Sequence, residues 1–354
     1  MIMFPSQLTL LIIILLVFFL SLHLVGIMKH QTNLNKKNKP KLVLLWTPFF
    51  QEVNYIKPLN KMKCDHTNCV FTSDKKLLKE SDAVIFHHRD LNPRNIPQRP
   101  NFEQIWISLN LESPVHTPRN FYYLNGQVNW TISYRHDADI VALPKLVNRT
   151  MPYRIKKNYT LNKDKPIVWF VSHCSTPGKR EDFVKHLHDS IPIDIYGTCG
   201  HLKCTPKMSD KCYHLMSRYY FYLSFENSIC DDYVTEKFFN ILDYDIIPIV
   251  FGGANYSRHL PYSGYIDALS FQSPRHLSEY LAHLIKHPEE YNKFFEWKKD
   301  YQFSEEYFGC QICRKLNDKQ TNPKTWKNLS QWWFSSLCKK WTQTDLVPSD
   351  YVYN

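Results

Sequence analysis

The sequence predicts an α/β protein in which two Rossmann-like domains face each other across a cleft. Two blocks of strand-like apolar runs support this prediction, because strands that alternate with helices form parallel sheets covered by helices. The first block has such runs at 42–46, 83–87 and 105–109. The second has them at 167–172, 193–196, 220–225, 246–251 and 264–266. A charged, proline-containing stretch, 151–166, lies between the blocks and predicts an interdomain linker.

The segments between the strand-like runs complete this picture. In the second block, residues 180–190, 235–242 and 277–286 have helical spacing of apolar side chains, and in the first block we expect helical stretches or loops. The sequence contains no G-x-G-x-x-G, so a dinucleotide-dependent dehydrogenase is unsupported. A chain of 354 residues accommodates two domains of ordinary size. We place them at 41–160 and 161–317, followed by a C-terminal tail at 318–354.

The composition describes a globular, basic protein. Hydrophobic residues make up 44% of the chain, charged residues 22%, and the formal net charge is +11. The positive charges are scattered along the chain, and no helix-turn-helix, RNP or zinc-finger pattern accompanies them. We therefore expect no nucleic-acid partner. An enzyme that handles a diphosphate and carries a basic stem explains the charge equally well.

An apolar run at the N-terminus predicts a membrane anchor. Residues 8–28 form a near-continuous apolar run that Ser21 and His23 interrupt, and the run is long enough to span a bilayer. A cleaved signal peptide is disfavoured because no small-x-small pattern follows. We expect a cytoplasmic tail at 1–7, a transmembrane signal anchor at 8–28 and a polar stem at 29–40. Lysines after the span would, by the positive-inside rule alone, place the body in the cytosol.

Two other features favour a body in the secretory lumen. Sequons for N-glycosylation occur at Asn129, Asn148, Asn158, Asn255 and Asn328. The ten cysteines are an even number, as in disulfide-bonded lumenal proteins. We give these features more weight than the charge bias, and we expect a single-pass type II membrane protein with its body in the secretory lumen.

The segment 225–237 is the most informative part of the chain. It follows a buried strand-like run and precedes a helical pattern, and open α/β sheets bind their ligands at such a junction. The loop offers the carboxylates of Glu226 and Glu236, an aromatic ring at Tyr233 and the cation of Lys237. Carboxylates accept hydrogen bonds from sugar hydroxyls, and a cation near a helix N-terminus favours a diphosphate. These residues suit a nucleotide sugar; the alternative is an ordinary junction with a solvated loop.

This segment closely resembles the donor-binding signature of the α1,3/4-fucosyltransferases, which are inverting enzymes that use GDP-fucose. Further motifs of that family follow in the right order. They are 111–118 (LESPVHTP), 130–139, 169–174 with Arg180, and the C-x-x-C at 310–313. The resemblance covers roughly 100–315 and implies two Rossmann-like domains of the GT-B type. Within the family, the chain is most similar to the invertebrate and core-type branch.

The resemblance also implies roles for individual residues. Glu112, at the end of a buried run, corresponds to the proposed general base; an isolated glutamate there would more often cap a turn. Arg180 and Lys237 would stabilise the diphosphate, while Glu226 and Glu236 would hold hydroxyls of fucose or ribose. Tyr222, Asn227 and Tyr233 would fix the nucleotide, and Ser172 and His173 would line the phosphate site.

Metal binding is the weakest of these signals. Asp137 and Asp139 form a D-x-D pair, as do Asp243 and Asp245, but a hard cation needs more oxygen ligands than two. The resembling family stabilises its leaving diphosphate with Arg, Lys and backbone donors. We therefore expect no obligatory metal, and stimulation by Mn²⁺ stays open.

The cysteines fall into two groups. In the resembling family the C-terminal C-x-x-C bridges to a pair in the N-terminal domain, which here would be Cys64 and Cys69, bonded to Cys310 and Cys313. A zinc site made from these four cysteines and His66 is the chemical alternative. Cys199, Cys204, Cys212 and Cys230 form a second local group. Connectivity does not follow from sequence alone.

Taken together, these patterns predict a GDP-fucose-dependent α1,3-fucosyltransferase that acts on O3 of an N-acetylglucosamine in glycoprotein glycans. The core N-acetylglucosamine of N-glycans is one acceptor, and Lewis-type antennal fucosylation is the alternative. Two other functions stay open: a transferase for another nucleotide sugar, and a non-catalytic lumenal glycan-binding protein that kept the fold. A homodimer formed through the stem is also open.

Overall fold

The computed structural model describes residues 21, 23, 39–52, 55, 59–60, 64, 68–151, 157–205, 210–304, 306–318, 324–343 and 345–349. Within this part of the chain, no helix combines the length and apolar character needed to cross a bilayer. The predicted anchor at 8–28 lies outside the described residues except for Ser21 and His23, as do the predicted cytoplasmic tail and nearly all of the stem.

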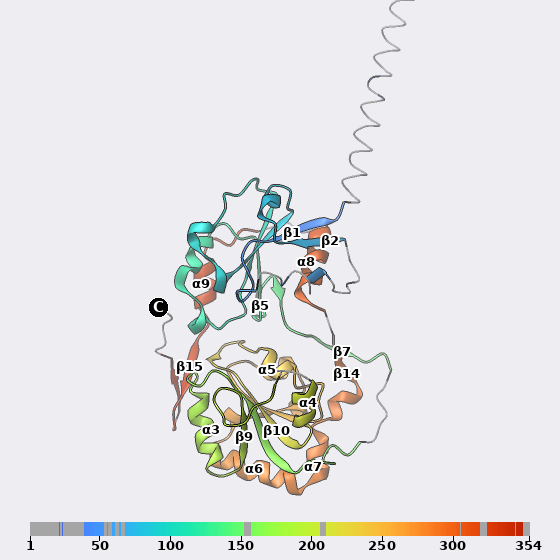
Figure 1. Ribbon diagram of the computed structural model, residues 1–354, viewed down its shortest axis with the longest axis vertical. Helices are drawn as coiled ribbons and strands as arrows, with labels where there is room; N and C mark the ends of the chain where they lie inside the picture. Colours follow the sequence, from blue (N-terminus) through green and yellow to red (C-terminus); the bar gives the residue numbers. More distant parts are fainter. Residues whose placement is uncertain are drawn as a thin grey trace, which may run out of the picture.

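The first half of the chain is built on a parallel sheet (Figure 1). Its six described strands have the order β2-β1-β3-β4-β5-β6. They are β1 (Lys41–Leu45), β2 (Cys69–Thr72), β3 (Ala83–His87), β4 (Ile105–Leu109), β5 (Trp130–Ser133) and β6 (Ile140–Val141). Every residue of β3 and β4 is buried, which is why these strands read as continuous apolar runs in the sequence.

The second half contains a five-stranded parallel sheet with the order β13-β12-β10-β8-β9. The strands are β8 (Lys165–Phe170), β9 (Ile193–Tyr196), β10 (Tyr219–Phe225), β12 (Ile247–Phe251) and β13 (Ile266–Asp267). Helices α3 (Arg180–His188) and α6 (Pro274–Lys286) pack together against one face through Phe183, Leu187, Leu277 and Leu281. On the other face, Met216 of α4 (Asp210–Met216) joins Val168 and Tyr222.

Most of the predicted strands and helices are present, and two differ. The predicted helix at 235–242 is shortened to α5 (Glu236–Phe239), because the backbone N–H groups of Ile241 and Leu242 donate to the carbonyl oxygens three residues back, as in a tight turn, and not four residues back. The predicted strand at 264–266 becomes the short strand β13, which begins at Ile266 after a 3₁₀ turn, Tyr262–Gly264.

Both sheets have a topological switch point. In each sheet, the second strand of the chain pairs on one side of the first strand, and the third strand pairs on its other side. The switch therefore lies between β1 and β3 in the first sheet and between β8 and β10 in the second. In open α/β sheets, ligands bind at the carboxyl ends of the strands beside such a point. The fold therefore directs attention to the segments after β1, β3, β8 and β10, and to the neighbouring segment after β4.

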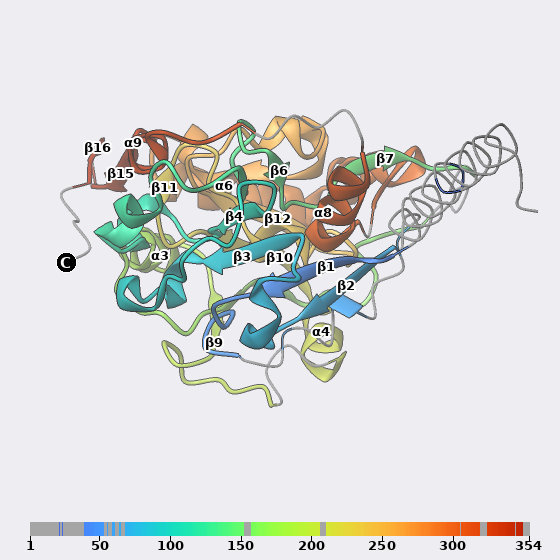
Figure 2. The same ribbon diagram turned by 90° about the horizontal axis from the view of Figure 1, so that it is seen from above.

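Two sets of contacts join the halves on opposite sides of the molecule (Figures 1 and 2). On one side, β7 (Leu146–Asn148) pairs with β14 (Tyr301–Phe303), and α8 (Phe308–Asn317) then packs against the first sheet. Disulfides Cys64–Cys310 and Cys69–Cys313 hold α8 there. Residues 308–317, which we expected in the second domain, therefore lie with the first, because the chain crosses back before α8.

The other connection is made by residues 329–341, called here the C-terminal strap. Its helix α9 (Leu329–Phe334) packs on the 3₁₀ segment Arg119–Leu124 of the first half. Its strand β15 (Cys338–Trp341) pairs with β11 (Ile229–Cys230) of the second half and with β16 (Leu346–Pro348). The residues predicted as a tail are thus, where the structure describes them, part of the joint between the halves.

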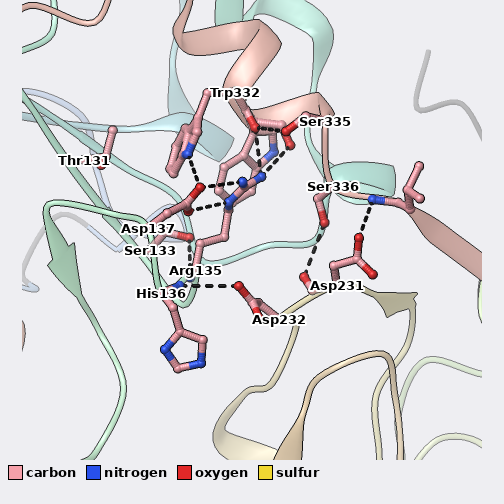
Figure 3. Close-up of polar contacts among 12 residues, drawn as sticks. Thr131, Ser133, Arg135, His136, Asp137, Asp231, Asp232, Trp332, Ser335 and Ser336 are labelled. Atoms are coloured by element: carbon pink, nitrogen blue, oxygen red, sulfur yellow. Dashed lines mark hydrogen bonds and ion pairs between the residues drawn. The ribbon is translucent and has the colours of Figure 1, made fainter. Parts of the chain in front are cut away.

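Polar contacts orient the strap (Figure 3). The Arg135 guanidinium donates to the carboxylate of Asp137 and to the carbonyl oxygen of Trp332, 2.8 Å away, while the Trp332 indole also donates to Asp137. On the other half, Asp231 accepts from the backbone N–H of Leu337 and from the hydroxyl of Ser336. One segment is therefore hydrogen-bonded to both halves within a few residues.

Trp333 anchors the strap in the first half. Its side chain has no exposed surface, its ring stacks 5.4 Å from that of Phe121, and its indole N–H donates to Thr117. We expect Trp333→Ala to lower the free energy of unfolding by about 3–5 kcal/mol because it removes a large buried side chain. Urea unfolding would measure the loss. The neighbouring Phe334→Ala, whose side chain is 38% exposed, is the control and should lose less than about 1 kcal/mol. Equal losses for both would contradict the anchoring role.

Candidate active site

Glu112 lies just beyond the carboxyl end of β4, beside Arg89, which follows β3. The backbone N–H of Glu112 donates to Asn110, and an Arg89 Nη1 lies 2.7 Å from Glu112 Oε1. The pairing follows from topology, since the carboxyl ends of neighbouring parallel strands meet at one edge of the sheet. Burial raises the pKa of Glu112 above its ordinary value, although Arg89 and Lys237 oppose the shift. Glu112 is therefore a carboxylate with increased proton affinity.

Glu226 is at the carboxyl end of β10 and is completely buried. One of its oxygens accepts from the backbone N–H of Thr235 at 2.8 Å, the Thr235 hydroxyl lies 2.9 Å from both oxygens, and Lys237 Nζ lies 3.1 Å from Oε2. Burial raises the pKa of Glu226, and Lys237 opposes that increase. We expected Glu226 to hold sugar hydroxyls. With its oxygens turned to Thr235 and Lys237 and no exposed surface, it instead fixes the ends of the loop 226–235, called here the Glu226 loop.

Lys237 is the cation of this loop. Its Nζ contacts the Thr235 hydroxyl at 2.8 Å, Glu226 at 3.1 Å and Glu236 at 3.1 Å. Burial by itself would lower the pKa of Lys237, but Glu226 and Glu236 raise it above the ordinary value. Lys237 is therefore a fixed positive charge at neutral pH. Its side chain keeps 27% exposure, so the charge is accessible to a ligand.

A cavity of about 480 Å³ lies between the two halves. The first half contributes Phe50, Leu111, Glu112, Tyr134, Ala142, Leu143 and Pro144, and the second contributes Asn227, Tyr233, Val234, Thr235, Glu236, Lys237, Phe239 and Asn240. Five predicted site residues thus meet in one space: Glu112, Asn227, Tyr233, Glu236 and Lys237. A carboxylate of increased proton affinity comes from one half, and a cation that stays partly exposed comes from the other.

Arg180, which we expected to stabilise the diphosphate, lies at the switch point of the second sheet. Its side chain is buried, and its guanidinium donates to the carbonyl oxygens of Phe225 at 2.5 Å and of His173 at 3.2 Å. Burial lowers the pKa of Arg180, and the charge of Glu226 partly opposes that decrease. Arg180 therefore ties the segments after β8 and β10 together at the switch point, and it does not line the cavity between the halves.

The groups around His116 produce a positive electrostatic field. Its imidazole lies 5.8 Å from that of His173. Burial lowers the pKa of His116 to about 4, and His173, Arg89, Arg180 and Lys237 lower it as well. Basic groups from both halves therefore act on a single imidazole. Such a field stabilises an anion, and its location beside Lys237 makes it suitable for a diphosphate.

Ser172 lines a second cavity, at the carboxyl ends of β8 and β9. That cavity measures about 380 Å³ and is lined by Phe170, Val171, Ser172, Tyr196, Gly197, Thr198, Lys203, Cys204 and Thr205. Tyr222 does not line it, but its ring stacks 6.2 Å from Phe170. Gly197 has φ +108°, and a Cβ there would lie 2.3 Å from the Val171 carbonyl oxygen, so the turn depends on glycine. Of the predicted site residues, five line the first cavity and Ser172 lines the second, while His173, Arg180, Tyr222 and Glu226 line neither.

The disulfides agree with one part of the expectation and correct another. The bonds Cys64–Cys310 and Cys69–Cys313 are those that the resemblance implied, and they leave no thiolate for the alternative zinc site. Of the second group, only Cys204 and Cys212 bond to each other. Cys199 pairs with Cys174, and Cys230 pairs with Cys338 of the strap. Cys174 and Cys338 were missed because their partners are defined by folding and not by spacing.

The sequons differ in accessibility. Asn148, Asn158, Asn255 and Asn328 are exposed. Asn129 is only 4% exposed, and its side chain accepts from the backbone N–H of Trp106 and donates to the carbonyl oxygen of Lys324. A glycan is bulky and needs a surface position, so Asn129 is corrected from candidate sequon to buried structural residue.

The aspartates of the first D-x-D pair, Asp137 and Asp139, bind different partners. Asp137 binds Arg135 and Trp332, whereas Asp139 accepts from Thr131 and from the indole N–H of Trp326. The two carboxylates are therefore committed to separate structural hydrogen bonds. Within the described residues, His283, His287 and Glu290 are the group whose donor atoms come close enough for a metal, and they lie on α6 and α7 (Pro288–Lys293), away from both cavities.

Sequence reasoning missed Arg89, His116 and Phe50. Arg89 follows the buried run 83–87 just as Glu112 follows the run 105–109. If the two runs had been treated as neighbours in one parallel sheet, the pair could have been predicted. His116 lies within the motif at 111–118, but its electrostatic surroundings come from four separate segments. No local signal identified Phe50, whose position depends on a turn.

Comparison with known proteins agrees with this geometry. The family model described as "Fucosyltransferase, N-terminal" matches residues 38–145, and the model described as "Glycosyltransferase family 10 (fucosyltransferase) C-term" matches residues 160–332. Together they cover both halves and the beginning of the strap.

Curated relatives include proteins of two invertebrates. Glycoprotein 3-alpha-L-fucosyltransferase A of Drosophila melanogaster is 35% identical over 284 residues, which are 77% of this chain but only 56% of that protein. Alpha-(1,3)-fucosyltransferase C of the same species is 32% identical over 332 residues, covering 84% of this chain and 78% of the relative. Alpha-(1,3)-fucosyltransferase fut-1 of Caenorhabditis elegans is 31% identical, covering 88% and 73%.

The fold is also similar to that of a solved structure, an alpha1,3-fucosyltransferase with GDP-fucose. The TM-score is 0.53 with 16% sequence identity, and the match covers 80% of this chain and 92% of that chain. At this identity the similarity shows a shared two-sheet architecture.

The buried pair of Glu226 and Lys237 makes stability depend on pH in a defined direction. In Lys237→Met, Glu226 loses its counter-charge, so its folded-state pKa rises further above the value of about 4.5 in the unfolded chain. The folded protein then binds a proton that the unfolded chain releases, and stability falls as pH rises from about 4.5 towards the folded pKa. At neutral pH we expect a loss of about 3–5 kcal/mol.

Urea unfolding of Lys237→Met between about pH 5 and 8 would measure this effect. The double variant Lys237→Met/Glu226→Gln is the matched control, because a neutral amide has no proton to exchange. It should show a weaker pH dependence than the single variant. A loss of stability in Lys237→Met that is the same at every pH would contradict the coupling.

Proposed function

The chain belongs to glycosyltransferase family 10, the fucosyltransferases, and from this premise we propose that it transfers L-fucose from GDP-β-L-fucose to O3 of an N-acetylglucosamine. The observation that carries the proposal is the cavity between the halves, where Glu112 and Lys237 come from opposite sides. A hydroxyl to be deprotonated and a diphosphate to be released need such groups on either side of the reacting carbon.

The reaction is a single displacement with inversion. Glu112 accepts the proton of the acceptor O3 hydroxyl, and that oxygen forms a bond to C1 of fucose. The bond between C1 and the β-phosphate oxygen breaks at the same time, passing through an oxocarbenium-like state, and GDP leaves. Burial raises the pKa of Glu112, which makes it a stronger base than an exposed carboxylate. The proton and the leaving group depart on opposite sides of the sugar.

The leaving diphosphate needs positive charge that is present before the reaction. Lys237 supplies a cation held by Glu226 and Glu236, and the field that depresses the pKa of His116 comes from the same region. Preorganised charge of this kind stabilises a developing anion without reorganisation. Arg180 contributes by holding the segments after β8 and β10 together. No step requires a metal ion, and stimulation by Mn²⁺ would come from binding the diphosphate.

We assign the guanosine to the second cavity. Phe170 and Tyr196 line it with aromatic rings, and Ser172 connects it to His173. It lies at the carboxyl end of β8, beside the switch point where nucleotides bind in doubly wound sheets. Gly197 allows the close approach of the turn that forms its wall.

The acceptor is proposed from the named relatives, and the location is proposed from the disulfides. The named relatives include a glycoprotein 3-alpha-L-fucosyltransferase, which favours the core N-acetylglucosamine of N-glycans, and antennal N-acetyllactosamine is the second candidate.

We propose a Golgi type II membrane protein with its body in the lumen. Five disulfides use all ten cysteines, which suits an oxidising compartment. A non-catalytic glycan-binding protein would have no use for a base of increased proton affinity opposite a cation.

The first test is Glu112→Gln in the lumenal part of the chain. We expect GDP release from GDP-fucose in the presence of acceptor to fall by roughly 10²–10⁴-fold, because the amide cannot accept the proton. GDP affinity should stay within about twofold, since Glu112 belongs to the other half. The acceptors are an agalacto N-linked glycan and N-acetyllactosamine, with GDP-mannose as the donor control. The exposed Glu103→Gln is the matched variant and should retain full activity. Near-normal turnover in Glu112→Gln would remove it as the base.

A second test uses the contact between Arg89 and Glu112. Arg89→Met removes a cation that lowers the pKa of Glu112, so that pKa should rise further. A base works only when deprotonated; hence the acid limb of the kcat/KM profile should move to higher pH by about one unit. The exposed Arg94→Met serves as control and should leave the limb in place. An unchanged limb in Arg89→Met would show that another group titrates there.

A further inference from the structure

Phe50 adopts a backbone conformation that an aromatic residue rarely takes. It has φ +50° and Gln51 has φ +65°, while Phe49 and Glu52 exchange two backbone hydrogen bonds of 3.2 and 3.0 Å across them. Two consecutive positive φ values between paired residues define a tight hairpin turn, for which Asn-Gly is the usual sequence. A bulky side chain at the first position is strained, and such strain persists only where surrounding contacts hold it.

The surrounding contacts do hold this turn. The backbone N–H of Gln51 donates to Asp90 Oδ1 at 3.1 Å, and the other Asp90 oxygen lies 2.7 Å from His87 Nδ1. The Phe50 ring packs against the rings of Phe49 and His87, with centroids 4.8 and 4.7 Å away. The turn is thus fixed beside the switch point of the first sheet, between the segments after β1 and β3.

The side chain does not serve the core. Phe50 is 42% exposed, and it lines the cavity that contains Glu112. Arg89 connects the two, since its guanidinium lies 5.7 Å from the centre of the Phe50 ring and 2.7 Å from the Glu112 carboxylate. A strained, partly exposed aromatic ring next to the base is poorly explained by packing. It is well placed to contact a ligand.

We propose that Phe50 is the platform on which the acceptor pyranose stacks, an assignment that rests on the proposed transferase function. A pyranose ring has a face of C–H groups that packs on an aromatic ring, while its hydroxyls stay at the rim. Stacked on Phe50, the sugar is held beside Glu112, with Leu143 and Pro144 completing the apolar wall of the same half. The opposite wall, with Asn227, Glu236 and Lys237, is left to the donor.

Phe50→Asn is the decisive variant, because asparagine tolerates a left-handed conformation and removes the ring. We expect its acceptor KM to rise about tenfold, which corresponds to the loss of one stacking contact. The donor KM and the slow release of GDP without acceptor should stay within about twofold of wild type. The thermal midpoint of Phe50→Asn should equal or exceed that of wild type, because asparagine tolerates the left-handed conformation. If Phe50 had a merely structural role, the midpoint would fall. Phe50→Trp should keep the acceptor KM within about threefold.

Phe102→Asn is the matched control, since Phe102 is 92% exposed on the same half and lines neither cavity. Direct binding of the agalacto N-linked glycan to the GDP-saturated protein, measured by NMR, makes the test independent of turnover. Binding by wild type that weakens about tenfold in Phe50→Asn supports the platform even if no transfer is seen. Equal binding by both proteins, no binding by wild type, or a donor KM that rises with the acceptor KM would overturn it. Absence of turnover with normal glycan binding would count against the transferase function alone.

Discussion

The ion pair between Glu226 and Lys237 is the interaction on which the site depends. Glu226 is completely buried at the carboxyl end of β10, and its oxygens hold both Thr235 and Lys237. The Glu226 loop is therefore closed at both ends, and the cation is fixed at the wall of the cavity. A buried carboxylate is costly unless it is paired, so the pair and the loop conformation stabilise each other.

The position of this loop matters only in relation to Glu112, which belongs to the other half. Two crossings set that relation. One consists of β7, β14 and α8 with its two disulfides, and the other is the C-terminal strap. The bond Cys230–Cys338 attaches the strap close to the Glu226 loop, while Trp333 anchors it in the first half. Because the crossings lie on opposite sides of the molecule, they restrain both the separation and the twist of the halves.

The base and the cation of the site lie on opposite walls of the cavity. On the first half, burial favours the protonated form of Glu112 and Arg89 limits that effect. On the second, two carboxylates keep Lys237 charged in spite of its burial. A base and a cation that face one cavity would neutralise each other in direct contact. Here each has its own partner, Arg89 or Glu226, so both stay available for different parts of a bound substrate.

The sequence by itself determined the two parallel sheets and five of the residues that line the cavity between the halves. Strands 83–87 and 105–109 were predicted to the residue because parallel strands buried on both faces are continuous apolar runs. The edge strand 193–196 was also predicted to the residue, although it contains Asp194 and is only partly buried. Short or polar strands such as β11 and β15 were missed, since they exist only through pairing with distant segments. Tertiary structure alone decided that Arg89 faces Glu112, that Glu226 and Arg180 support the site from below its surface, that Cys230 bonds to Cys338, and that Phe50 lies beside the base. Each of these depends on contacts between segments far apart in the chain, which no local pattern specifies.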